Sequence, residues 1–239
     1  MTRLAASRSL LAFDLDGTLA PLVAERAEAS VPPIFAARLR ALARLWPVAV
    51  ITGRALADAR PRLGFEPRFL FGNHGAERDG TAAAPALAAR LDSLRERLER
   101  TRTKWHALGI DLEDKGLSLA LHHRAATDPA LARHWLDDFA ESAPTDVLPS
   151  HGHAVLNLVP RHAPNKGDAL LQALHEAESD CALFVGDDAN DEPAFARVPA
   201  GSVGVRIGAE DAPTAAAYHL EEQRQVGVLL SMLLAMRAA

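Results

Sequence analysis

The sequence predicts an α/β protein, a parallel sheet with helices on both faces, that is interrupted by an α+β insertion. Towards both ends of the chain, short apolar runs alternate with segments of helical length, as in strand–helix–strand units. The middle of the chain instead carries a long charged amphipathic segment and then several short alternating segments. A length of 239 residues accommodates a core domain with a modest insertion of this kind.

The elements before the insertion are expected in the following order. Residues 9–13 form an apolar run that stops near the turn-prone pair Asp16-Gly17, and this run is the first strand. Pro32 and Pro33 open a helix that runs to about Leu45, because a missing N–H costs little in a first helical turn. The remaining elements are strands at residues 47–52 and 68–71 and a helix from residue 54 towards residue 60.

The insertion is predicted to span residues 83–160, which leaves residues 1–82 and 161–239 as the core domain. It begins with one long helix from residue 86 to about 108, in which leucines recur at helical spacing. A second helix at residues 129–141 and strands at 110–113, 117–121, 146–148 and 154–159 complete it. The core then resumes with helices at 166–176 and 191–197, strands at 182–185 and 202–207, and a final helix at 226–236.

Composition limits the possible partners. The chain has 31 acidic and 26 basic residues and a net charge of −5, so we expect no nucleic-acid partner. Its apolar runs are too short to span a bilayer and it shows no targeting segment, so we expect a cytoplasmic protein without a membrane partner. The single cysteine, Cys181, excludes an intramolecular disulfide and is predicted to be a buried, inert thiol.

The hexapeptide Phe-Asp-Leu-Asp-Gly-Thr places Asp14 and Asp16 where the first strand ends. In a parallel sheet this carboxyl edge is where ligands bind. An ordinary surface turn is the alternative, because Asp and Gly are common turn residues.

Two further motifs offer groups that suit a phosphate. Thr52, Gly53 and Arg54 follow a buried strand and supply a hydroxyl, a flexible N–H and a guanidinium. Thr52 is equally plausible as a helix N-cap. Lys166 opens a helix after Pro164 and is expected to direct its charge to the same edge, the alternative being a solvated surface lysine.

The segment Gly-Asp-Asp-Ala-Asn-Asp-Glu at residues 186–192 adds four carboxylates after another strand. Together with Asp14 and Asp16 they gather six acids at one edge of the predicted sheet, and these repel one another unless a cation neutralises them. A site made only of oxygen ligands favours Mg²⁺ over Zn²⁺. We therefore expect Mg²⁺ as the cofactor.

The four motifs, in this order, resemble those of the haloacid-dehalogenase-like phosphohydrolases. Longer strings, FDLDGTLAPL, FGNHGAE, EDKGLSLALHHR and VGDDANDEPAF, are similar to trehalose-6-phosphate phosphatases. The resemblance implies a Rossmann-like doubly wound core with an inserted α/β cap. It also implies a phosphatase that hydrolyses trehalose 6-phosphate through an aspartyl-phosphate.

The resemblance assigns roles to residues of this chain. Asp14 is implied as the nucleophile, Asp16 as the general acid and base, and Thr52 and Lys166 as groups that neutralise the phosphoryl group. Mg²⁺ is implied to bind Asp14, the backbone carbonyl of Asp16, and Asp187, with Asp188 and Asp191 orienting waters or Lys166. The expected substrate-binding residues are Gly53, Arg54, Glu113, Lys115, His122, Arg124 and Asn157.

One position departs from the family. Asn157 stands where a glutamate that binds sugar hydroxyls is usual, which keeps another sugar phosphate open as the substrate: a sucrose, mannose or glucosylglycerate phosphate. Two kinds of non-enzyme compete with the phosphatase interpretation. A phosphoacceptor signalling domain is about half this length and lacks the second aspartate, and a catalytically silent sugar-phosphate-binding relative would not need every core motif.

Overall fold

The computed structural model describes residues 8–23, 26–81, 85–152, 154–209 and 213–238. Its contacts divide the chain into a core unit, Met1–Thr81 with Pro164–Ala239, and an inserted unit, Ala82–Ala163. The sequence places these divisions at 82/83 and 160/161, and the first of the two lies outside the described residues.

The core unit contains a seven-stranded sheet in the order β11-β10-β9-β1-β2-β3-β4. Neighbouring strands are parallel except for β4, which runs antiparallel to β3. The strands are β1 (Ser9–Phe13), β2 (Val48–Ile51), β3 (Phe69–Gly72), β4 (Glu77–Arg78), β9 (Cys181–Gly186), β10 (Val203–Ile207) and β11 (Tyr218–Leu220). Because the chain adds β2 and β3 on one side of β1 and β9 on the other, the strand order reverses between β1 and β9.

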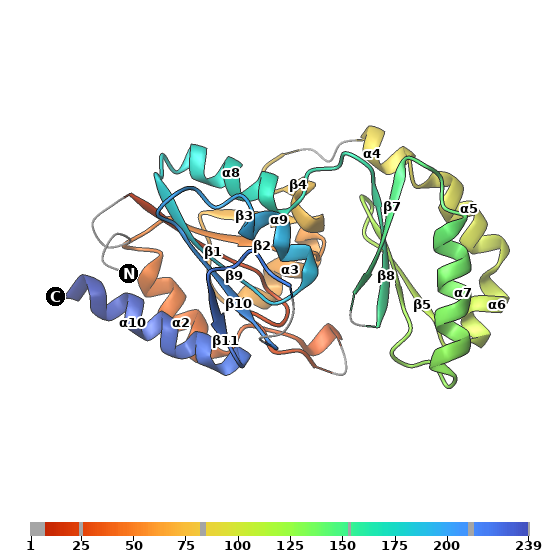
Figure 1. Cartoon of the computed structure of the whole chain (residues 1–239), viewed down its shortest axis with the longest axis horizontal. Coiled ribbons are helices and arrows are strands. Elements are labelled where there is room, and N and C mark those ends of the chain that lie inside the picture. Colours follow the sequence, from red (N-terminus) through yellow and green to blue (C-terminus); the bar gives the residue numbers. More distant parts are fainter. Residues whose placement is uncertain (1–7, 24–25, 82–84, 153, 210–212, 239) are drawn as a thin grey trace. The chain divides into compact units, whose positions relative to one another are not determined.

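Helices cover both faces of this sheet (Figure 1). They are α2 (Pro33–Leu42), α3 (Leu56–Leu63), α8 (Lys166–Glu176), α9 (Glu192–Phe195) and α10 (Val226–Ala238). Successive residues of β1 point to opposite faces: Leu11 and Phe13 pack with α2, α3 and α10, whereas Leu10 and Ala12 pack with α8 and α9. All four of these side chains are fully buried. The predicted doubly wound α/β core is confirmed.

The inserted unit is a four-stranded antiparallel sheet in the order β5-β6-β8-β7. Its strands are β5 (Asp111–Asp114), β6 (Leu119–His122), β7 (Val147–Gly152) and β8 (Val155–Pro160). Its helices are α4 (Pro85–Ala89), α5 (Asp92–Arg100), α6 (Arg102–Ala107) and α7 (Pro129–Glu141). Leu119, Leu121, Leu156 and Leu158 turn one sheet face to a core that α5, α6 and α7 complete. The opposite face is left to more polar side chains.

The single long helix expected from residue 86 to 108 is wrong, because the segment forms α4, α5 and α6. The second break has a clear local cause. The Thr101 hydroxyl donates to the Arg97 carbonyl at 2.9 Å, and the Trp105 indole N–H donates to the Leu98 carbonyl at 2.9 Å. The Arg97 carbonyl still accepts from the Thr101 backbone N–H at 3.1 Å, so it is at Leu98 that a side-chain donor takes a carbonyl that a continuous helix would use.

Smaller differences concern short elements. The strands β4 and β11 have two and three residues and were not predicted. The helix expected from residue 54 begins at Leu56 with Ala55 as its N-cap, so Thr52 is not an N-cap. The helix expected at 191–197 is a 3-10 turn, Ala189–Asp191, followed by the short α9. Further 3-10 turns are Arg26–Glu28, Asn73–Gly75 and Gln223–Gln225.

Two predictions from composition can be compared with the structure. Cys181 is buried, as predicted. Among the described residues, none of the helices has both the length and the apolar character needed to cross a membrane.

Candidate active site

The acidic motifs meet where the strand order reverses. Asp14 follows β1 and Asp187 follows β9, and the Asp14 N–H donates to the Val185 carbonyl at 2.9 Å. Thr52 follows β2 at the same carboxyl edge of the sheet. This switch point is the position at which doubly wound sheets bind ligands.

Lys166 lies at the start of α8 and its charge reaches this edge. The Asn165 side chain accepts from the N–H groups of Gly167 and Asp168, and Asp168 in turn accepts from the Asn165 N–H, which forms a capping box. The Lys166 ammonium lies 2.8 Å from Asp14 and 2.6 Å from Asp191. Lys166 is only 2% exposed, so the alternative of a solvated surface lysine is wrong.

Asp191 organises the loop after β9. Its Oδ1 accepts from Lys166, and its Oδ2 accepts from the N–H groups of Asp187 and Asp188 at 2.9 and 3.0 Å. Gly186 permits this close packing, because a Cβ there would lie 2.4 Å from the Asp191 Cγ. The Asp188 carboxylate accepts from the Ala189 backbone N–H and from the Asn190 side-chain amide, both within the same turn.

Burial of these acids has electrostatic consequences. Burial raises the pKa of Asp14 well above its ordinary value; Lys166 opposes this shift, and Asp191 and Asp187 add to it. Burial, followed by repulsion from Asp191, raises the pKa of Asp187 to about 7. Burial alone would lower the pKa of Lys166, but Asp14 and Asp191 raise it above its ordinary value. Lys166 is therefore firmly charged, and it does not fully neutralise its acidic neighbours.

Three of these acids are spaced so that they could hold a metal ion. One carboxylate oxygen each from Asp14, Asp187 and Asp191 lies within 4.8 Å of the others. An all-oxygen donor set with uncompensated negative charge suits a hard divalent cation. Asp191 is the member whose two oxygens already accept hydrogen bonds, which favours Asp14 and Asp187 as ligands.

Arg54 contacts carboxylates of its own unit. Its Nε and Nη2 donate to both oxygens of Asp16 at 2.7 and 2.6 Å, and its Nη1 donates to Asp58 at 2.6 Å. This bidentate pair fixes the position and orientation of the Asp16 carboxylate. The sequence predicts a phosphate contact for Arg54; in the structure its guanidinium, 3% exposed, holds the candidate acid and base.

Thr52 and Gly53 lie beside a tight turn. Thr52 is fully buried, and its hydroxyl accepts from the Arg54 N–H at 3.2 Å. The imidazole of His74 packs so closely on Gly53 that a Cβ at Gly53 would lie 2.5 Å from it. His74 has a φ of 58°, a left-handed conformation that is uncommon for a residue other than glycine.

Within the inserted unit, two of the expected sugar-binding residues, Glu113 and Asn157, lie in one row across the sheet. Glu113 pairs with Ala120 across β5 and β6, and Ala120 pairs with Asn157 across β6 and β8, so their side chains share the face opposite the apolar core. The Glu113 carboxylate lies 3.1 Å from the His122 Nε2 and 3.7 Å from the Lys115 ammonium. Arg124 follows β6, two residues after His122.

Sequence reasoning missed several polar contacts. The Thr18 hydroxyl donates to the Asp187 carboxylate at 3.2 Å, a contact that was not predicted although Thr18 belongs to the motif FDLDGT. Glu77 accepts from Leu56 N–H at 2.9 Å and from the Asn73 amide at 3.0 Å, which fixes the turn beside His74. Asp58, the second partner of Arg54, lies four residues away, a helical spacing that could have signalled the pair.

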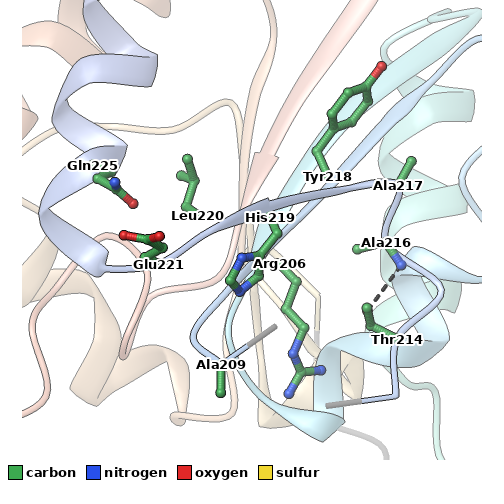
Figure 2. Close-up of a pocket in the computed structure, with 10 residues that line it drawn as sticks. All are labelled: Arg206, Ala209, Thr214, Ala216, Ala217, Tyr218, His219, Leu220, Glu221 and Gln225. Atoms are coloured by element: carbon green, nitrogen blue, oxygen red, sulfur yellow. Dashed lines mark hydrogen bonds between the residues drawn. The ribbon is translucent and has the colours of Figure 1, made fainter. Parts of the chain in front are cut away.

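Two pockets among the described residues of the core unit can be compared with the motif residues. The larger, about 680 Å³, runs along β10 and β11 past Arg206 and His219 and includes none of the residues predicted from the motifs (Figure 2). The smaller, about 420 Å³, is lined by Gly17, Asp187 and Gln223, among others. The smaller pocket, and not the larger, reaches the acidic residues.

The chain is similar to a known protein family and to several named proteins. The trehalose-phosphatase family matches residues 12–224. A probable trehalose-phosphate phosphatase of Sinorhizobium fredii is 35% identical over 208 residues, which covers 83% of this chain and 77% of that protein. The trehalose-phosphate phosphatase of Mycobacterium bovis is 32% identical over 249 residues, which covers 93% of this chain and 60% of that protein.

A solved structure shows the same fold. The C-terminal domain of the C. albicans trehalose-6-phosphate phosphatase superposes with a TM-score of 0.83 at 26% identity, covering 98% of this chain and 94% of that one. Because the family matches most of the chain and its motifs converge at one sheet edge, the chain belongs to the trehalose-phosphatase family, a family of phosphatases.

Proposed function

We propose that this protein hydrolyses trehalose 6-phosphate to trehalose and phosphate through an aspartyl-phosphate on Asp14. The observation that carries the proposal is the buried Asp14–Lys166–Asp191 arrangement at the switch point of the sheet. It holds a carboxylate beside a fixed positive charge, which is what attack on a phosphate dianion requires. The similar proteins of S. fredii and M. bovis are named as trehalose-phosphate phosphatases, which supports trehalose 6-phosphate as the proposed substrate.

The proposed steps use residues of the core unit. An Asp14 oxygen attacks phosphorus, the bond from phosphorus to the sugar oxygen breaks, and Asp16 donates a proton to that oxygen. Asp16 then removes a proton from the water that attacks the aspartyl-phosphate and releases phosphate. The pair with Arg54 holds the Asp16 carboxylate in place for the second step; for the first step Asp16 must donate a proton and therefore leave Arg54. Thr52 and Lys166 are proposed to stabilise the transferring phosphoryl group.

A divalent cation, proposed as Mg²⁺, fits the acids that Lys166 leaves uncompensated. Asp14, Asp187 and the backbone carbonyl of Asp16 are proposed to hold it. When bound, such an ion neutralises charge on the phosphate and on the carboxylates around it. Asp191 and Asp188 then keep the loop after β9 in place.

The sugar is proposed to bind the polar face of the inserted sheet. Glu113, Lys115 and His122 form a polar cluster there, Asn157 lies in the same row of paired residues as Glu113, and Arg124 is assigned to the same role. Carboxylate, ammonium and amide groups are the side chains that hydrogen-bond sugar hydroxyls.

A panel of sugar phosphates tests the proposed substrate. Trehalose 6-phosphate should give the highest kcat/KM when compared with sucrose, mannose and glucosylglycerate phosphates. A higher kcat/KM for any of the other sugar phosphates would mean that Asn157 accompanies a change of substrate. No turnover of any panel member or of p-nitrophenyl phosphate would identify the chain as a silent relative.

Asp14→Asn tests the nucleophile. We expect kcat to fall about a thousandfold or more, because an amide is neutral and a poor nucleophile. The exposed Asp180→Asn serves as a matched control and should keep wild-type activity. Covalent catalysis by Asp14 is wrong if purified Asp14→Asn retains more than about a hundredth of the wild-type rate.

Asp187→Asn tests the charge balance without substrate. Because the pKa of Asp187 is raised to about 7, its contribution to stability is present below its ordinary pKa of 3.8 and lost as pH rises through about 7. In chelator at pH 8, Asp187→Asn should therefore melt about 3 °C or more above wild type, roughly the effect of 1 kcal/mol.

The same measurement at pH 5 is the control, since the advantage should shrink when wild-type Asp187 is protonated. Added Mg²⁺ should raise the Tm of wild type at pH 8 more than that of Asp187→Asn. A variant that is less stable than wild type in chelator at both pH values contradicts this charge balance.

Lys115→Ala tests sugar recognition. The Lys115 side chain is 7% exposed and its ammonium lies beside Glu113. Its loss should lower kcat/KM for trehalose 6-phosphate about tenfold, the effect of one charged hydrogen bond. Turnover of p-nitrophenyl phosphate, which has no sugar, should stay near wild type. Lys104→Ala, at an exposed position of α6, is the matched control. An equal loss on both substrates would assign Lys115 to folding and not to the sugar.

A further inference from the structure

The loop between Asp14 and Ala20 is held from a distant part of the chain. The Gln223 side-chain amide donates to the carbonyls of Thr18 and Leu19, at 3.0 and 3.2 Å. Thr18 and Leu19 are fully buried, and Gln223 lies 205 residues further along the chain than Thr18. One amide therefore satisfies two neighbouring backbone acceptors, which would lose their partner if it were removed.

Gln223 is itself anchored. It begins the 3-10 turn Gln223–Gln225 that leads into α10, and Gln225 accepts from the Glu222 N–H at 3.1 Å. Directly after this turn Val226 is fully buried, and the Gly227 carbonyl accepts from Arg38 of α2 at 2.9 Å. The start of α10 is thereby fixed against α2, which gives Gln223 a rigid base.

The loop that Gln223 holds touches Asp187 in two ways. The Thr18 hydroxyl donates to the Asp187 Oδ1 at 3.2 Å. Gly17, at a φ of +78°, packs on the same carboxylate so closely that a Cβ would lie 2.0 Å from Oδ2. Gln223 also lines the pocket of about 420 Å³ that contains Gly17 and Asp187. A shift of this loop must therefore change the surroundings of the Asp187 carboxylate.

We infer that Gln223 is a positioning residue for Asp187, which it orients through the Thr18 backbone and hydroxyl. The inference rests on the proposed function in one respect, the assignment of Asp187 as a metal ligand. Groups that orient a ligand from behind set its affinity for the ion without touching it. Gln223 holds the backbone carbonyls of Thr18 and Leu19, and the Thr18 hydroxyl in turn donates to Asp187.

The test is direct binding of Mn²⁺, followed by the electron paramagnetic resonance signal of the free ion without substrate. Gln223→Ala and Gln223→Glu, which lose the donor, should weaken Mn²⁺ affinity about threefold to tenfold, the low end for indirect ligand support. Arg224→Ala is the matched control, because it removes an exposed side chain of the same short turn, one that pairs with Glu222; it should bind Mn²⁺ as wild type does.

Thr18→Val guards against a variant that fails to fold, since it removes only the hydroxyl and keeps the shape. It should weaken Mn²⁺ binding about tenfold, while its Tm in chelator stays close to that of wild type. The inference is overturned if Gln223→Ala or Thr18→Val binds Mn²⁺ like wild type, or if Arg224→Ala is weakened as much as Gln223→Ala.

Asp187→Asn distinguishes failure of the proposed metal site from failure of the positioning role of Gln223. If wild type does not bind Mn²⁺, or if Asp187→Asn does not abolish the binding, the proposed metal site fails and the role of Gln223 fails with it. If wild type shows that binding and the Gln223 variants match it, only the positioning role is wrong.

Discussion

The buried ammonium of Lys166, between Asp14 and Asp191, is the interaction on which the rest of the site depends. A charged lysine is costly to bury unless it is paired, and here two carboxylates provide the pairing. The same contacts fix the position of Asp14 and connect α8 to the loop after β9. Removing the Lys166 charge would leave two buried carboxylates without the cation that lies between them.

The topology explains why residues far apart in sequence meet here. Asp14 and Asp187 are separated by the whole inserted unit, yet β1 and β9 are neighbours and their carboxyl ends adjoin. The insertion leaves after β4 and returns before α8, so it adds a second unit without disturbing the central strands. Glycines at 17 and 186 then let the two loops approach the acidic side chains within contact distance.

The sequence was informative where function and local pattern coincide. The strand at residues 9–13 and the helices at 129–141 and 166–176 have the predicted bounds, because apolar periodicity and capping residues agree there. It was uninformative where one side chain acts at long range. No spacing rule links Gln223 to Thr18, and the Arg54–Asp16 pair depends on how two loops turn. The break near Thr101 involves the indole donor of Trp105.

Trapping the phosphorylated enzyme tests the proposed chemistry most directly. Wild-type protein mixed with trehalose 6-phosphate is quenched in acid within one turnover, digested, and analysed by mass spectrometry. One phosphoryl group should appear on the peptide that contains Asp14, and hydroxylamine should remove it, as expected for an acyl phosphate. A phosphoryl group on another residue, or turnover without any phosphorylated peptide, would contradict the role of Asp14.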